Sequence, residues 1–230
     1  MPSIFKTEYA ALEQGLQLSQ EDHAASGQIG QEIEYLFFFK LSDLSQLLKA
    51  PKIVEQEQYE LILPKAEGST QQGFLRVRSE RLKGANDTIY TLTLKVAEDG
   101  VRGRKEAPQE ISQDFYELYK GLCAKGMTKT RFYFPIEGGE GKGPDGSDLV
   151  WEVDVFADPT TEGACPWVKV DLEVSAPLEE IPAFPLSYTK KITNQWDQRT
   201  EAEQAFIKSL WDQVYTPALE PETVDDAPAA

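Results

Sequence analysis

Alternation of apolar and polar residues is the feature that most limits how this chain can fold. Successive side chains of a strand point to opposite faces, so a strict period of two is typical of a half-buried strand. Glycine, proline, asparagine and aspartate separate the alternating segments and indicate turns. The expected strands are residues 31–39, 57–63, 73–81, 89–96, 129–135, 150–156 and 167–175.

Three other segments have helical character. Residues 112–123 begin at Ser112, a favourable N-cap, and place aromatic and leucine side chains on one face. Residues 200–215 show a similar periodicity with two glutamates in the first turn, and residues 42–50 form a weaker candidate. We therefore expect an α+β fold in which helices flank a sheet.

The polar faces of the expected strands each carry mostly one sign of charge. The faces near residues 32–34, 152–154 and 171–173 are acidic, whereas basic residues occupy those near 76–78 and 129–131. One interpretation is a solvated outer face, on which cross-strand ion pairs contribute only about 0.2–1 kcal/mol each. The other is a closed barrel with the charges inside. Such an interior must hold ions or a polyanion, because isolated buried charges are prohibitively costly.

The net charge disfavours several classes of function. The 230 residues include 39 acidic and 23 basic residues, for a formal charge of −16. This excess argues against nucleic-acid or anionic-membrane binding, because both depend on basic surfaces. His23 is the only histidine and lies in a polar segment, which disfavours a histidine-dependent triad or zinc site.

Compartment and domain organisation follow from a few further features. Cys123 and Cys165 are the only cysteines, so we expect no disulfide framework. The longest strongly apolar run, residues 35–39, is far too short to span a bilayer, and we expect a cytoplasmic protein. Residues 1–28 are expected to form a partly helical extension, 29–216 the main domain, and the acidic residues 217–230 a disordered tail.

The motifs on these strands resemble those of the CYTH superfamily, the triphosphate tunnel metalloenzymes. The resemblance covers about residues 31–195: EIEYL is similar to the ExExK signature, and LRVR, TLTLK, KTRFYFP, WEVDVF and VDLEV follow in the family's order. It implies a closed eight-stranded antiparallel β tunnel with flanking helices. It also implies that carboxylates hold Mg²⁺ or Mn²⁺ and that arginine and lysine side chains grip a triphosphate.

The resemblance assigns roles to residues of the polar faces, position by position. The catalytic candidates are Glu32, Glu34 and Arg78. The metal-binding candidates are Glu34, Glu152, Asp154 and Glu173. The substrate-binding candidates are Arg76, Arg78, Lys95, Lys129, Arg131 and Lys190.

Leu36 departs from this pattern, because it replaces the lysine of ExExK and removes a cation from the expected phosphate-binding face. Lys40 lies on the same expected strand face as Glu32 and Glu34, but it is four residues, or about 13 Å, beyond Leu36 along the strand. Lys190 or Lys191 is the other candidate replacement.

The expected function is metal-dependent hydrolysis of inorganic, nucleoside or thiamine triphosphate. Two alternatives remain, and the leucine at position 36 favours them over catalysis: a non-catalytic tunnel that sequesters a nucleotide or polyphosphate, and an acidic protein-interaction module. A homodimer and a protein partner bound through the acidic surface or tail also remain open.

Overall fold

The structure is a computed structural model of the chain. It describes residues 33–63, 73–97, 104–123, 125–138, 141–143, 146–156, 165–193, 199–214 and 216–217. The expected N-terminal extension, the candidate residue Glu32 and residues 218–230 of the expected tail lie outside this described part.

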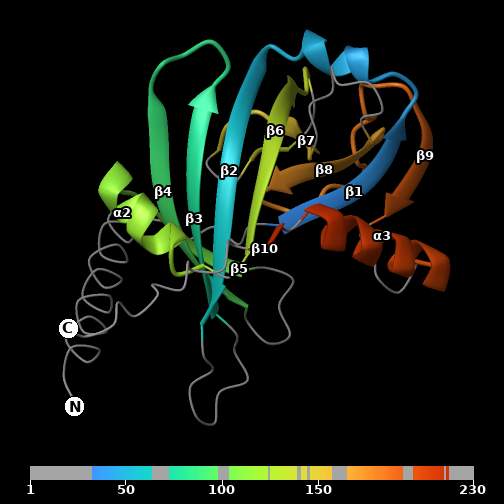
Figure 1. Cartoon of the computed structure of the whole chain (residues 1–230). Coiled ribbons are helices and arrows are strands. Elements are labelled where there is room, and N and C mark those ends of the chain that lie inside the picture. The colour runs from blue at the N-terminus through green and yellow to red at the C-terminus, as the bar shows by residue number, and fades with distance from the viewer. Residues whose placement is uncertain are drawn as a thin grey trace, which may run out of the picture.

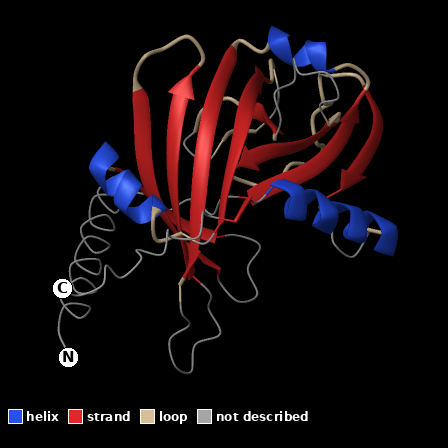
Figure 2. Cartoon of the chain, viewed as in Figure 1, coloured by secondary structure: helices blue, strands red, loops and turns tan. Residues whose placement is uncertain are grey.

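One large antiparallel sheet with few helices dominates the described residues (Figures 1 and 2). Its strands follow the spatial order β5-β4-β3-β2-β6-β7-β8-β1-β9, and the short β10 pairs with β6. The strands are β1 Ile33–Leu41, β2 Lys52–Ile62, β3 Gly73–Leu82, β4 Thr88–Ala97, β5 Arg104–Glu110, β6 Lys125–Pro135, β7 Val150–Val155, β8 Trp167–Val174, β9 Tyr188–Thr193 and β10 Thr216–Pro217. The helices are the 3-10 helix η1 Leu44–Lys49 and the α-helices α2 Gln113–Lys120 and α3 Glu201–Val214.

The sheet is curved but not closed, so the prediction of a closed eight-stranded barrel is wrong. Nine strands lie on one hydrogen-bonded path, and within the described residues β5 and β9 each pair with a single neighbour. Both edges resist further pairing, because β5 contains Pro108, which has no N–H to donate, and β9 carries Lys190 and Lys191. Neither strand alternates apolar and polar residues, which explains why the sequence pattern did not predict them.

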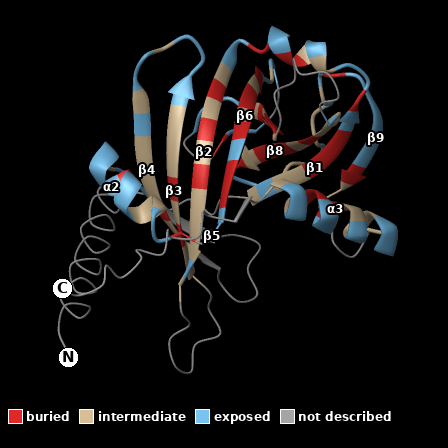
Figure 3. Ribbon diagram, in the orientation of Figure 1, coloured by how far each residue is buried: buried red, intermediate tan, exposed pale blue. Residues whose placement is uncertain are grey.

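The two faces of the sheet differ in character. We define the charged face by the side chains of Glu34, Glu60, Arg76, Arg78, Glu80, Lys129, Arg131, Glu152, Asp154, Lys169, Asp171 and Glu173. On the other face of β1, β6, β7 and β8 lies the main core, where Val170 and Leu172 are fully buried (Figure 3). Leu47 of η1 packs into this core, and Phe184 stacks on Phe39 with ring centroids 4.2 Å apart. The chain therefore covers the apolar face with its own loops.

Helix α3 packs against one end of the charged face. Phe38 shares a strand face with Glu34, and its ring lies edge-on to Trp211 of α3 with centroids 6.0 Å apart. Trp167 of β8 packs against Phe206 of α3 with centroids 4.7 Å apart. This aromatic layer ends the row of charged residues along β1 and β8.

Both α-helices begin with side-chain caps, of which the sequence predicted Ser112. The Ser112 hydroxyl accepts a hydrogen bond from the Phe115 N–H at 3.3 Å. At the start of α3, Thr200 and Glu203 form a reciprocal capping box, with bonds of 3.2 and 3.0 Å. In the described ranges, neither helix is long and apolar enough to cross a membrane.

Candidate functional site on the charged face

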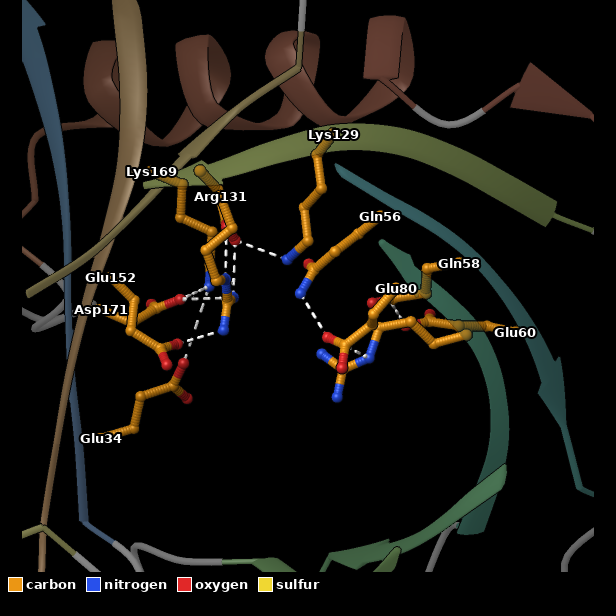
Figure 4. Close-up of polar contacts among 12 residues, drawn as sticks. Glu34, Gln56, Gln58, Glu60, Glu80, Lys129, Arg131, Glu152, Lys169 and Asp171 are labelled. Atoms are coloured by element: carbon orange, nitrogen blue, oxygen red, sulfur yellow. Dashed lines mark hydrogen bonds and ion pairs between the residues drawn. The ribbon is translucent and has the colours of Figure 1, made fainter. Parts of the chain in front are cut away.

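Strand register explains why residues distant in sequence meet on the charged face. Arg131 of β6 lies opposite Asp154 of β7, and Glu152 of β7 lies opposite Asp171 of β8. Asp171 in turn lies opposite Leu36 of β1. Opposed side chains on one face are about 4.5–5.5 Å apart at Cβ, so ion pairs can form between neighbouring strands. Figure 4 shows Arg131, Glu152 and Asp171 pointing into the space that the curved sheet partly surrounds.

Arg131 lies at the centre of an ion-pair network on the acidic side. Its Nε and Nη2 donate to the two carboxylate oxygens of Asp154 at 2.6 and 2.8 Å, and its Nη1 donates to Glu152. Nη2 also lies 3.6 Å from Asp171 Oδ2. Burial alone would raise the pKa of Asp154, but Arg131 and Lys129 outweigh burial and hold that pKa well below its ordinary value. Asp154 is therefore a buried, permanently charged anchor for Arg131.

Lys129 is a second cation on the same carboxylate. Its Nζ donates to Asp154 Oδ2 at 2.6 Å, and its side chain is buried. Burial, with a smaller effect of Arg131, lowers the pKa of Lys129 to about 7 against the opposing influence of Asp154. Two of the cations expected to bind phosphate are thus paired with a carboxylate of the protein.

Lys169 and Asp171 extend the network toward β1. Lys169 Nζ donates to Asp171 Oδ2 and lies 3.7 Å from Glu34 Oε1. Burial and the neighbouring charge of Asp171 raise the pKa of Glu34. Asp171 Oδ1 is buried and has no hydrogen-bond partner among the described residues. This side of the face therefore carries negative charge that its own cations only partly balance.

Arg76 and Arg78 of β3 form the basic side. Arg78 Nε lies 3.2 Å from Glu80 Oε1, and Gln56 Nε2 donates to the same oxygen at 2.5 Å. The Arg78–Glu80 contact is an ion pair without hydrogen-bond geometry, because the buried Arg78 Nε has no hydrogen-bond partner among the described residues. Burial, together with the neighbouring charge of Arg78, lowers the pKa of Arg76 to about 10. Glu60 and Glu80 on the same side oppose this effect, so two carboxylates match the two β3 arginines in number.

Tyr133 of β6 lies between the acidic and basic sides. Burial raises its pKa to about 12, with Glu152 as the next largest cause and smaller effects of Arg131, Glu80 and Arg78. Tyr133 lies directly opposite Glu152 of β7, and β6 separates β7 from β2 and β3 in the sheet. The two sides therefore face one common space, as Figure 4 shows.

The other predicted site residues are placed as follows. Glu173 of β8 is partly buried and lies opposite Glu34. Lys190 of β9 is exposed and lies opposite Lys40 at the edge of the sheet. Lys95 belongs to β4, but its side chain lies outside the described part. The structure therefore brings Glu34 into the network and leaves Lys190 at the edge.

Several residues of the face were not among the sequence candidates. Tyr133, Lys169 and Asp171 share the strand parity of predicted site residues, so the pattern already placed them on this face. Gln56 was not predicted, because the expected strand began at residue 57 whereas β2 begins at Lys52. The full set of additions is Gln56, Gln58, Glu60, Glu80, Tyr133, Lys169 and Asp171.

A divalent cation on the acidic side would need oxygen ligands, which Mg²⁺ and Mn²⁺ prefer. Within the described residues, no three acidic, histidine or cysteine side chains gather around a common point. The donor chemistry nevertheless fits: Asp171 Oδ1 lacks a partner, and burial and nearby carboxylates raise the pKa of Glu152 against the effect of Arg131. Asp171 and Glu173, neighbours on one face of β8, are the described residues that would hold such a cation.

A cavity of about 820 Å³ opens on the other face of β2 and β3. Its lining includes Glu55 and Arg81, which form an exposed ion pair with a separation of 2.5 Å. Its lining carries charges of both signs, so we assign it no ligand.

Comparisons with known proteins give only distant likenesses. No protein-family model and no curated protein matches the chain. Among solved structures, the PH1819 protein from Pyrococcus horikoshii OT3 is 17% identical with a TM-score of 0.41, covering 81% of this chain and 92% of that one. A candidate adenylate cyclase (bh2851) from Bacillus halodurans is 14% identical with a TM-score of 0.37, covering 64% and 83%. Because both TM-scores are below 0.5, we draw no functional argument from them.

Proposed function

We propose that the charged face binds a small polyphosphate between its basic and acidic sides. The observation that supports this most is the pair of arginines, Arg76 and Arg78, which strand register places on the same face as a group of carboxylates. Arginine presents a planar fork of donors that matches phosphate oxygens. The lowered pKa of Arg76 reflects burial and a neighbouring positive charge, and a bound anion would relieve that repulsion.

We extend the proposal to hydrolysis of a triphosphate with Mg²⁺ or Mn²⁺, the substrate being inorganic, nucleoside or thiamine triphosphate. Phosphoryl transfer depends mainly on positioning and charge neutralisation, which residues already present on this face can provide. Arg78, ion-paired with Glu80, would orient the phosphate, and Glu34 would orient the attacking water. A cation held by Asp171 and Glu173 would neutralise phosphate charge and activate water.

Binding without turnover is the second candidate, and the Asp154 contacts favour it. Both Lys129 and Arg131 are hydrogen-bonded to this buried carboxylate. Neither side chain can therefore move to neutralise the negative charge that develops on a reacting phosphate. Such a protein would sequester a polyphosphate or nucleotide on the charged face.

One set of measurements separates these candidates. Purified protein is mixed with tripolyphosphate or ATP, with Mg²⁺, Mn²⁺ or EDTA, and both phosphate release and the thermal midpoint are recorded. The variants are Glu34→Gln and Arg78→Ala. Arg81→Ala is the matched control, because it removes an arginine from an exposed ion pair on the other face of the same strand.

Each candidate predicts a different result. Hydrolysis predicts metal-dependent phosphate release that Glu34→Gln and Arg78→Ala abolish and Arg81→Ala preserves. Sequestration predicts a higher thermal midpoint with tripolyphosphate, lost in Arg78→Ala, and no release. If the wild-type protein shows neither effect, polyphosphate binding is wrong and a protein-interaction role takes its place.

A further inference from the structure

The ammonium group of Lys169 lies beside two carboxylates whose residues are neighbours of Leu36. Leu36 is directly opposite Asp171 in the β1–β8 pair, and Glu34 is its next neighbour on the same face of β1. Lys169 Nζ donates to Asp171 Oδ2 and lies 3.7 Å from Glu34 Oε1. The ammonium therefore occupies the part of the charged face that adjoins position 36.

The local packing explains this direction of the Lys169 side chain. Lys169 lies opposite Phe38 and is therefore a diagonal neighbour of Leu36, about 7–8 Å away, which a lysine side chain can span. On the other side, Phe38 is buried under Trp211 of α3, so the aromatic layer blocks the opposite direction. Leu36 offers an apolar surface for the methylene stem of a lysine whose head remains polar.

The Lys169 side chain is available to the space in front of the sheet. It is 14% exposed and lies beside the carboxylates of Asp171 and Glu34 (Figure 4).

We infer that Lys169 supplies, from β8, the cation that β1 lacks at position 36, and that it contacts a phosphate oxygen of the bound polyphosphate. The inference rests on the proposed binding function and adds a ligand-binding residue to it. It also makes Lys40 and Lys190 unnecessary as replacements, since both are exposed where β1 pairs with the edge strand β9.

The test places a lysine at position 36 of β1 in a variant that lacks the Lys169 ammonium. Tripolyphosphate binding is measured by titration calorimetry, with and without Mg²⁺, for Lys169→Met and for the double variant Leu36→Lys/Lys169→Met. Lys49→Met is the control, because it removes the same charge from an exposed position at the end of η1. Urea midpoints are recorded for every variant.

We expect Lys169→Met to weaken tripolyphosphate binding about 10- to 100-fold, the loss typical of a charge-assisted hydrogen bond. Lys49→Met should bind like the wild type. The double variant should recover most of the affinity, because its new ammonium faces the same two carboxylates.

Two results would overturn the inference: wild-type affinity in Lys169→Met, or a folded double variant that binds no better than Lys169→Met. If Lys169→Met does not fold, the double variant alone decides, because it retains the charge. If the wild-type protein does not bind tripolyphosphate, the proposed function itself is wrong. If the wild-type protein binds it and Lys169→Met binds equally well, only the role of Lys169 is wrong.

Discussion

Replacing Arg131 by methionine should destabilise the protein strongly, because Arg131 holds the buried carboxylate of Asp154. The variant loses both hydrogen bonds to Asp154, at 2.6 and 2.8 Å, and the bond to Glu152. Removing one partner of a buried ion pair typically costs about 3–5 kcal/mol, since the other charge stays buried. For a protein of this size, that corresponds to a thermal midpoint lower by about 6–20 °C.

The loss of unfolding free energy caused by Arg131→Met should be smaller at acidic pH. The folded-state pKa of Asp154 lies well below its ordinary value, so in the wild type its stabilising contribution is present at neutral pH and persists until the pH falls below the unfolded-state pKa. Arg131 is the largest cause that lowers this pKa, so the pKa of Asp154 rises in Arg131→Met. Protonation then removes a buried charge that only Lys129 still contacts, and the difference in unfolding free energy between the two proteins should narrow from pH 7 to about pH 4.5.

Urea denaturation followed by circular dichroism at both pH values measures these effects. Arg81→Met is the control, because the Arg81–Glu55 pair is exposed and such pairs contribute at most about 1 kcal/mol. The double variant Arg131→Met/Asp154→Asn should recover part of the loss by removing the buried charge. Equal urea midpoints for Arg131→Met and Arg81→Met would refute the argument that Asp154 is buried and depends on Arg131.

Two further substitutions test the packing on the two faces of the sheet. Gly126→Ala should cost about 1–3 kcal/mol of unfolding free energy, because the new Cβ would lie 2.3 Å from Tyr59 Cε1. In Gly121→Ala the nearest atom is 3.5 Å away, so its urea midpoint should stay close to that of the wild type. Phe38→Ala should cost about 3–5 kcal/mol and shift the tryptophan emission to longer wavelength, since Phe38 covers Trp211. Unchanged emission in this variant would contradict the packing of α3 on the charged face.

Strand parity was sufficient to place most residues of the face, because the direction of a strand side chain is a local property. Arg131 and Glu152 were predicted on polar faces, and they contact each other in the structure. Parity does not specify which strands are neighbours. The pairing of β1 with β8 joins Ile33 to Val174, and such long-range register depends on the packing of the whole sheet.

The position of the Lys169 ammonium shows the limit of local reasoning more clearly. Its parity was visible in the sequence, but a long side chain can extend in either direction along a strand. Phe38 and Trp211 select the direction here, and their contact requires α3 to dock on the charged face. The sequence predicted α3 as a helix but contained no local signal for the face that it covers.

The charge balance of the face connects these observations to ligand binding. Among the residues that define the face, five cations (Arg76, Arg78, Lys129, Arg131 and Lys169) lie beside seven carboxylates (Glu34, Glu60, Glu80, Glu152, Asp154, Asp171 and Glu173). Strand register places Lys52 and Lys125 on the same face, opposite Tyr133 and Glu60, so the two signs nearly balance. A polyphosphate must therefore compete with carboxylates for the arginines. A divalent cation beside Asp171 would add positive charge where the carboxylates are most numerous. If polyphosphate binds on this face as proposed, its affinity should therefore rise with Mg²⁺, whether or not hydrolysis follows.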